Sequence, residues 1–421
     1  MSESILDVTD QYSTWRDLYL VVQGLFYFAQ GIAMGAIFYL PSLLRDRGLN
    51  DLESIIIQAV IWLPWYLKVF FGILSDNVKI KNYGRRKPYV IVAGFLGIIG
   101  WLTLPTYTVF GPMMILSGIL ASFGTSMSDG ILDALAVDVT PPRRRGAMQG
   151  VSWGSRGLGL GIAAVIVGLL TAAGEWFIAF AVPGVILGLA CLFVILIKEV
   201  PLPEDFKRVP LGVLTGVFKQ KNVQLCTLFQ LFAGAGISIL AILQTYLETG
   251  LGFDLVTVGI VFLIFSIGMF IGAIIFGLLG DKLSVLQTLP VTTILYTVII
   301  LSVLIIDTSD WAIAAIFFFL VGLANGGYEA TQMRISMDNS PAIVGGTMYN
   351  FYNSISNLGQ IAIGAILIAY LGEVVFSGNL QLGWQLAWVF LLLSLPVAYK
   401  LVKEHQVEGE GITEEAVPYH E

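Results

Sequence analysis

The chain has 421 residues, of which 57% are hydrophobic and 12% are charged, and its mean hydropathy is +0.84. This composition excludes an ordinary soluble domain, and the net charge of −7 argues against a nucleic-acid partner. We therefore expect an integral membrane protein that is embedded in a lipid bilayer.

Hydrophobic residues gather in twelve runs, each long enough to cross a bilayer as a helix. The runs of the first half are 18–44, 54–74, 89–107, 112–137, 147–171 and 176–197. Those of the second half are 223–247, 255–279, 283–306, 311–337, 342–371 and 383–402.

The chain repeats itself at an offset of about 200 residues. Six residues of the first half recur in the second half, five of them unchanged and one as another acid. In the first half they are Asp129, Asp138, Pro141, Gly146, Met148 and Gly159. In the same order, their partners are Glu329, Asp338, Pro341, Gly346, Met348 and Gly359. The string FGILSD from Phe71 also returns as FGLLGD from Phe276, at an offset of 205 residues. Duplicated hydrophobic halves that contain buried charges are typical of transporters. We expect an all-α membrane fold of two pseudo-symmetric six-helix bundles.

Basic residues predict how the chain is oriented and divided. Most Lys and Arg residues lie in the loops on one side of the spans and in the linker between the halves, so both termini and the linker should be cytoplasmic, in a cell or inner membrane. The predicted parts are an N-terminal six-helix bundle over 1–197, a cytoplasmic linker over 198–222, a C-terminal six-helix bundle over 223–403 and a disordered acidic tail over 404–421.

Several kinds of site are excluded by what the sequence lacks. Cys191 and Cys226 both lie within predicted spans, so there is neither a disulfide framework nor a thiolate metal site. The sequence has no Gly-rich phosphate loop ending in Lys and Ser or Thr, which argues against direct use of ATP. We expect no cofactor and no bound metal.

Two acids lie one turn apart in the run 112–137. Asp129 and Asp133 share one helical face, and Asp129 lies ~13 Å inside the end of the helix, close to the bilayer midplane. A carboxylate at that depth must be paired, protonated or facing water. We expect Asp129, Asp133 and Glu329 to couple movement of a solute to H⁺, although such oxygens can also bind Na⁺. The alternative is a structural ion pair with Arg156 or Lys68.

Polar side chains also form lines along two predicted helices. The first line is in the run 18–44 and the second in the run 342–371, and their members are Gln23, Tyr27 and Gln30, and Asn350, Asn353, Asn357 and Gln360. Their spacing places each line on one helical face. We predict that both lines face a shared aqueous cavity and bind substrate; hydrogen bonding between helices is the alternative.

Three basic residues inside predicted spans complete the expected substrate site. Arg156 has Ser356 at its repeat position, so the duplication did not require a charge there. A guanidinium binds a carboxylate through two parallel hydrogen bonds, which suits an organic anion. Alternatively, Arg156 pairs with an acid of the run 112–137. Lys68 and Arg334 are the other two residues that we assign to substrate binding.

The segment FGILSDNVKIKNYGRRKP, from Phe71 to Pro88, resembles the signature of the major facilitator superfamily between its second and third helices. This resemblance implies the major facilitator fold with twelve transmembrane helices. It also implies a conformational latch, whose residues in this sequence are Gly72, Asp76, Arg85, Arg86, Asp138, Gly277 and Asp281. A purely topological role for the basic residues is the alternative.

Other segments of the first half resemble the folate-biopterin transporter family. They are YFAQG from Tyr27, LPWYLK from Leu63, SDGILDALAVD from Ser128 and MQGVSWGSRGLG from Met148. This resemblance implies a monomeric secondary active transporter, such as an H⁺ symporter. It would move a small polar or anionic solute, folate-like, pterin-like or another organic molecule, by alternating access.

Two other functional classes stay open. A protein with this fold can assist the assembly of pigment complexes without transporting a solute. An intramembrane prenyl-transfer enzyme could hold magnesium and a diphosphate with Asp129 and Asp133. Met333 stands at the repeat position of Asp133, which argues against an enzyme.

Overall fold

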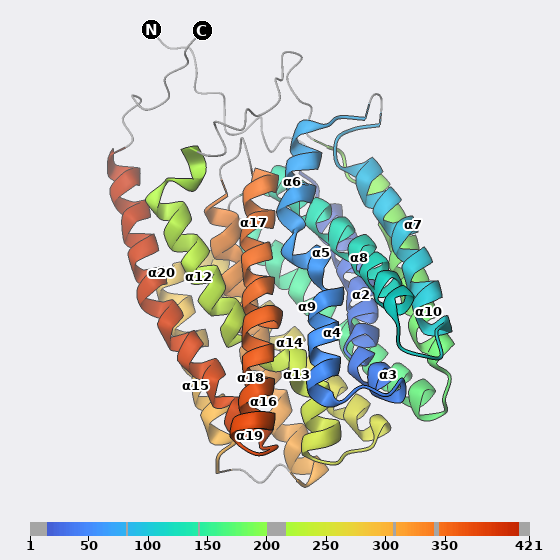
Figure 1. Cartoon of the computed structure of the whole chain (residues 1–421). Helices are drawn as coiled ribbons and strands as arrows, with labels where there is room; N and C mark the ends of the chain where they lie inside the picture. Colours follow the sequence, from blue (N-terminus) through green and yellow to red (C-terminus); the bar gives the residue numbers. More distant parts are fainter. Residues whose placement is uncertain are drawn as a thin grey trace, which may run out of the picture.

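The computed structural model of this chain describes residues 15–80, 83–141, 144–199, 216–305, 309–340 and 345–411 (Figure 1). Its regular elements are helices, so the all-helical prediction is confirmed. Within the described residues, ten helical stretches are long and apolar enough to cross a membrane: Leu18–Asp46, Lys87–Thr106, Pro112–Val139, Arg145–Ala172, Trp176–Leu196, Lys221–Gly250, Leu255–Gly280, Trp311–Asp338, Gly345–Val375 and Leu380–Lys403.

Some of these stretches contain more than one helix. The helices of the first half are α2 (Leu18–Ile37), α3 (Leu40–Asp46), α4 (Asp51–Ile61), α5 (Leu63–Tyr66), α6 (Lys68–Asn77), α7 (Lys87–Thr103), η1 (Leu104–Thr106), α8 (Pro112–Val139), α9 (Arg145–Ala172), α10 (Trp176–Ala190) and η3 (Cys191–Leu196). Those of the second half are α12 (Lys221–Gly236), α13 (Ile239–Thr245), η4 (Tyr246–Gly250), α14 (Leu255–Lys282), α15 (Val285–Ser302), α16 (Trp311–Asp338), α17 (Gly345–Asn357), η6 (Leu358–Ala365), α18 (Ile366–Tyr370), η7 (Leu371–Val375), α19 (Leu380–Gly383) and α20 (Gln385–Gly411). The elements η4, η6 and η7 are π-helical.

The predicted span 54–74 is not one continuous helix. It is divided into α4, α5 and α6, with breaks at Trp62 and Leu67. Pro64 has no amide hydrogen to donate to the carbonyl four residues earlier, which explains the first break. Trp62, Trp65 and Lys68, all from this broken stretch, line the central cavity. The break therefore helps to supply the residues of the site.

The first membrane-spanning stretch of each half is interrupted. α2 ends at Ile37 and α3 begins at Leu40, while α12 ends at Gly236 and α13 begins at Ile239. Both halves thus have a break within their first membrane-spanning stretch, at similar but not identical repeat positions.

Two predicted segments lie largely outside the described residues. Residues 200–215, which form most of the predicted linker, are among them, as are residues 412–421 of the predicted tail. The rest of that tail differs from the prediction, because α20 continues to Gly411. Residues 404–408 contain neither Gly nor Pro, so they can extend the helix that precedes them.

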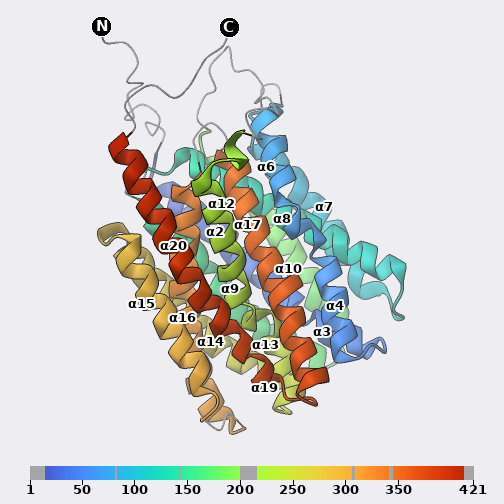
Figure 2. The ribbon, with the colours of Figure 1, turned by 60° about the vertical axis from the view of Figure 1, so that its left-hand side comes forward.

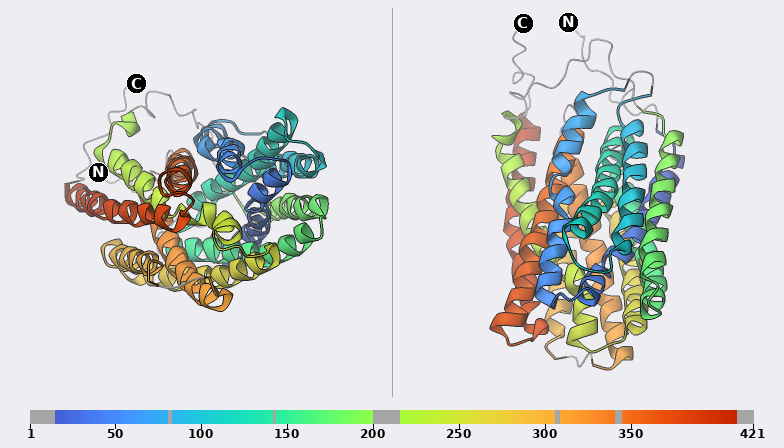
Figure 3. Two further views of the ribbon diagram at one scale, coloured as in Figure 1. Left: turned by 60° about the horizontal axis from the view of Figure 1, so that its bottom comes forward. Right: turned by 45° about the vertical axis from the view of Figure 1, so that its right-hand side comes forward.

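Helices of the two halves pack directly against one another. The helices of the first half, in blue to green, lie mainly on one side and those of the second half, in yellow to red, on the other (Figures 1 and 2). Two further views show the same arrangement (Figure 3). α9 packs along α14, and α17 packs against α6 and α8. These contacts surround the cavity described next.

Candidate functional site

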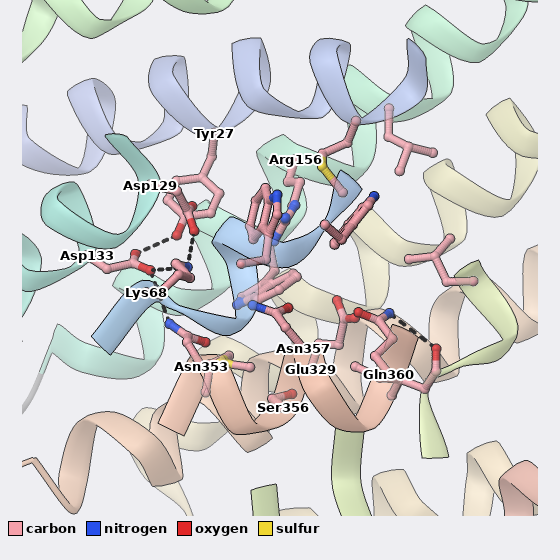
Figure 4. Close-up of a pocket in the computed structure, with 18 of the residues that line it drawn as sticks. Tyr27, Lys68, Asp129, Asp133, Arg156, Glu329, Asn353, Ser356, Asn357 and Gln360 are labelled. Atoms are coloured by element: carbon pink, nitrogen blue, oxygen red, sulfur yellow. Dashed lines mark hydrogen bonds and ion pairs between the residues drawn. The ribbon is translucent and has the colours of Figure 1, made fainter. Parts of the chain in front are cut away.

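A cavity of about 30 Å³ lies between the two halves (Figure 4). Its polar lining comes from α2, α6, α8 and α9 of the first half and from α16, α17 and η6 of the second half: Tyr27, Lys68, Asp129, Asp133 and Arg156, and Glu329, Asn353, Ser356, Asn357 and Gln360. A volume of this size has room for about one or two water molecules. An organic solute therefore requires the cavity to widen.

Lys68 and the two acids of α8 form a charged cluster. The Lys68 ammonium contacts Oδ2 of Asp129 and lies 4.0 Å from Oδ2 of Asp133. Gln30 donates a hydrogen bond to Asp129, and the hydroxyl of Tyr27 donates one to Asp133, each at 2.5 Å. All five side chains are buried. Buried charges are costly unless they are paired and hydrogen-bonded, and this cluster meets both conditions.

The charged cluster also contacts the second half. Asn353 of α17 donates a hydrogen bond from Nδ2 to Oδ2 of Asp133 at 3.3 Å. One turn earlier, Asn350 donates to the backbone carbonyl of Gly130 at 2.7 Å. α17 is thus bound to α8 beside the two acids. Any separation of the halves at this level must break these two hydrogen bonds.

Arg156 lies in the same cavity but has a different kind of contact. Its guanidinium lies over the rings of Trp153 and Trp65, 4.6 and 5.7 Å from their centroids. Among the described residues it has neither an ion pair nor a hydrogen bond. Stacking on aromatic faces fixes the guanidinium while its N–H donors stay available. From the sequence, we considered Arg156 and Lys68 as possible ion-pair partners of the acids in α8. Lys68, and not Arg156, forms this ion pair.

Glu329 stands at the repeat position of Asp129 but has different surroundings. Its side chain lies in the cavity wall and is 1% exposed. In the described part of the structure, Oε2 of Glu329 has no hydrogen-bond partner. No described ion pair includes this carboxylate. Glu329 is thus a buried acid, and one of its oxygens accepts no hydrogen bond from the described residues.

Neutral amides occupy the second half where the first half has charges. Gln332 donates hydrogen bonds to Gln230 at 2.7 Å and to Ser356 at 2.8 Å, and Gln230 donates to Ser336 at 2.6 Å. Ser356 stands at the repeat position of Arg156. The sequence interpretation missed this amide network, because the network joins α12 to α16 and no spacing rule relates residues of different helices. It also missed the two tryptophans that stack on Arg156, which lie in the strings LPWYLK and WGSRGLG.

Four residues predicted to bind substrate do not line the cavity. Gln30 lies behind Asp129, Asn350 contacts Gly130, and Gln23 is buried elsewhere in α2. Arg334 lies further away, with its Nε 3.4 Å from Oδ2 of Asp338 near the end of α16. Because five residues separate Arg334 from Glu329, the two side chains point to different sides of the helix.

Latch residues meet at one end of the molecule, which we call the Asp76 end. Oδ2 of Asp76 accepts hydrogen bonds from the backbone N and the hydroxyl of Thr347, at 2.7 and 2.6 Å. Thr347 lies in the first turn of α17, where a negative charge is favourable. Arg86 pairs with Asp76 at 2.7 Å and with Asp138 at 3.0 Å, and Arg85 pairs with Asp138 at 2.6 Å.

Two glycines of the predicted latch lie where helices of opposite halves approach closely. A Cβ atom at Gly72 would lie 2.7 Å from Cα of Thr347, and one at Gly277 would lie 2.8 Å from Cα of Gly150. Neither approach leaves room for a side chain. The side chain of Asp281 lies outside the described part of the structure.

Polar contacts between the halves also close the opposite end, which we call the Arg45 end. Glu248 of η4 accepts hydrogen bonds from Arg45, from Gln244 and, at 2.8 Å, from Ser42. Gln244 also donates to Ser42 at 2.7 Å. The cavity thus has contacts between the two halves on both sides of it.

Comparison with known proteins identifies the family of this chain. The model of the Major Facilitator Superfamily matches residues 19–364 and, in an overlapping match, residues 226–415. A folate-biopterin transporter of Synechocystis sp. is 28% identical over 280 residues, which cover 64% of this chain and 55% of that protein. The probable folate-biopterin transporter 4 of Arabidopsis thaliana is 28% identical over 142 residues, 32% of this chain and 29% of that protein. The chain thus spans about half of the first relative and less of the second.

A solved structure has a similar fold. The crystal structure of a bacterial homologue of the iron transporter ferroportin in an outward-facing state gives a TM-score of 0.64 at 14% identity, covering 91% of this chain and 99% of that chain. At this identity the likeness concerns the fold alone. The apolar helices and the family match together identify an integral membrane protein. The family model covers well over half of the chain, so the predicted resemblance is confirmed and the chain belongs to the Major Facilitator Superfamily.

Proposed function

We propose that this protein is a secondary active transporter that moves a small anionic solute across a membrane by alternating access, coupled to H⁺. The superfamily match and the names of the relatives favour a transporter over an enzyme. In this proposal two six-helix bundles, 1–197 and 223–403, move relative to each other, and the linker is cytoplasmic.

The cavity between the two halves is the observation that carries this proposal. Charged and amide side chains from both halves line it, and polar contacts between the halves lie on either side. Alternating access requires these two sets of contacts to open one at a time. The structure then corresponds to the closed intermediate between the two open forms.

Asp133 is the acid that we assign to the link between H⁺ and movement. As a carboxylate it accepts a hydrogen bond from Asn353 of the other half and lies near the Lys68 ammonium. A proton on Asp133 removes the negative charge that favours both contacts. Binding of H⁺ would therefore loosen α8 from α17, while Asp129 keeps its ion pair with Lys68.

An enzyme that uses the same two acids is less compatible with this geometry. Prenyl transfer would require Asp129 and Asp133 together to hold magnesium and a diphosphate. The Lys68 ammonium occupies the side of Asp129 that faces Asp133. The acids are thus arranged around a cation that the chain itself provides.

The test of this proposal is transport by purified protein in proteoliposomes. With an acidic exterior, we expect labelled folate to accumulate inside, accompanied by acidification that an internal pH-sensitive dye reports. Asp129→Asn and Asp133→Asn should abolish accumulation, while at least one of them keeps exchange of folate down its gradient. Glu373→Gln, a carboxylate variant outside the cavity lining, is the matched control.

Other outcomes would redirect the proposal. Accumulation that follows a Na⁺ gradient and ignores the pH gradient would replace H⁺ by Na⁺ as the coupling ion. Absence of flux for folate, biopterin and a panel of organic anions would favour a protein with this fold that does not transport. Full accumulation in both Asn variants would remove the two acids from the coupling mechanism.

A further inference from the structure

Three side chains of the cavity lining carry polar atoms that have no partner among the described residues. On the side of the first half, the Arg156 guanidinium and the indole N–H of Trp62 are donors without an acceptor among the described residues. On the side of the second half, Oε2 of Glu329 is an acceptor that forms no hydrogen bond there, and Nδ2 of Asn325, one turn earlier on α16, is a donor that forms none. Buried polar groups in native proteins nearly always have a hydrogen-bond partner. A ligand with an anionic group for the first-half donors and N–H groups for Glu329 would give these atoms partners.

Arg156 and Glu329 do not satisfy each other, although their charges are opposite. They are not within ion-pair distance in the described structure, since neither belongs to a described ion pair. Both line the cavity, Arg156 from α9 and Glu329 from α16 (Figure 4). A ligand that lies between an unpaired cation and an unpaired anion can form a charge-assisted hydrogen bond with each of them.

Aromatic rings give the cavity wall next to Arg156 flat surfaces. The rings of Trp62 and Trp65 stack with a centroid distance of 5.0 Å and an interplanar angle of 28°. Phe38 lies beside Trp62, at 6.4 Å between centroids, and all three residues line the cavity with Trp153. Flat aromatic faces favour a planar ligand, which can stack on them as it enters.

We propose that Arg156 and Glu329 are the two poles of one ligand site, which takes a planar solute with an anionic group at one end and N–H donors at the other. The anionic group binds Arg156 and the N–H of Trp62, and the donors bind the Glu329 carboxylate. This inference rests on the proposed function and assigns Glu329 to the ligand instead of the coupling ion. Because the poles lie in different halves, a bound solute connects them.

The test compares two planar probes of similar size. Pterin-6-carboxylate has a carboxylate and ring N–H donors, whereas 2-naphthoate has the carboxylate and the two fused rings but no N–H group. Affinity for each probe is measured by isothermal titration of the full chain in detergent. A charge-assisted hydrogen bond to Glu329 should make the pterin bind wild-type protein about tenfold to a hundredfold more tightly than the naphthoate.

Variants then assign each pole. Glu329→Gln should lower affinity for pterin-6-carboxylate about tenfold or more and leave that for 2-naphthoate unchanged, which also shows that the variant is folded. Arg156→Gln should lower affinity for both probes. Glu373→Gln, the same change outside the cavity lining, should alter neither. Glu329→Asp keeps the charge and should keep part of the preference for the pterin.

Three results would overturn the two-pole site. They are equal affinity of wild-type protein for the two probes, equal losses for both probes in Glu329→Gln, and no binding of either probe. The assay needs no gradient, so it is independent of the transport test. Coupled folate transport without a Glu329-dependent preference would remove only the two-pole site. A Glu329-dependent preference without coupled transport would keep the site and remove the transport mechanism.

Discussion

The two halves of the cavity have an acid at the same repeat position in opposite surroundings. Asp129 contacts the Lys68 ammonium and accepts a hydrogen bond from Gln30, so its charge is compensated within the first half. Glu329 has an oxygen without a partner in the described structure. Duplication thus preserved the position of a carboxylate but not the residues that compensate it.

The residues around the two acids also differ between the halves. Gln30 of α2 donates to the acid of its own half, whereas Gln230 of α12 belongs to the amide network of Gln332. Arg156 has the neutral Ser356 at its repeat position. Beside its acid, the first half therefore has an ion pair, whereas the second half has neutral hydrogen bonds and an acid without an ion pair in the described structure. A ligand or a proton can compensate an acid of that kind.

The largest expected change in stability comes from breaking the ion pair of the first half. Lys68→Met leaves Asp129 buried without its cation, which should lower the free energy of unfolding by about 3 to 5 kcal/mol. Lys68→Met combined with Asp129→Asn removes both charges and should recover most of that loss. The measurement is thermal and denaturant-induced unfolding of the purified protein in detergent.

This prediction has a clear contrary outcome. If Lys68→Met unfolds at the wild-type temperature, the ion pair with Asp129 contributes nothing to stability. The two halves would then differ in residue type but not in what these residues contribute to stability. If the double variant stays as unstable as the single one, Asp133, which also lies 4.0 Å from the Lys68 ammonium, accounts for the effect.

Sequence patterns predicted the positions of the site residues better than their partners. The repeat offset and the helical spacing identified Asp129, Asp133, Glu329 and the line of amides, because these depend only on distance along one helix. The contact of Lys68 with Asp129 joins two helices. It also depends on a broken helical stretch, which a run of hydrophobic residues does not reveal.

Other features needed three-dimensional packing for the same reason. The hydrogen bond from Asn353 to Asp133 joins different halves of the chain, and no spacing rule relates those two residues. Arg334 was assigned to the site because it is a charged residue in an apolar run, yet it lies near the end of α16 beside Asp338. A charge within a span is thus a weaker signal when the same helix carries an acid four residues away.

An intermediate effect is expected from Arg156→Lys. A compact ammonium cannot form two parallel hydrogen bonds to a carboxylate, so affinity for folate should fall about tenfold. Because Arg156 has no described ion pair, the melting temperature should change little. Titration with folate and a melting curve of the same sample measure both quantities. A lower melting temperature with unchanged affinity would make Arg156 a structural residue.

The smallest effect is expected in the amide network, where Ser356 marks the repeat position of Arg156. Ser356→Ala removes one neutral hydrogen bond from Gln332, which still donates to Gln230, so the free energy of unfolding should fall by only about 1 kcal/mol. Ser302→Ala, at a half-buried serine whose hydroxyl bonds only within its own helix, is the matched control for the loss of a hydroxyl. Unfolding in denaturant compares both variants with Lys68→Met. If Ser356→Ala lowers the free energy of unfolding as much as Lys68→Met does, the neutral network stabilises the protein as much as the ion pair does. The two halves would then differ in residue type but not in the stability that these residues provide.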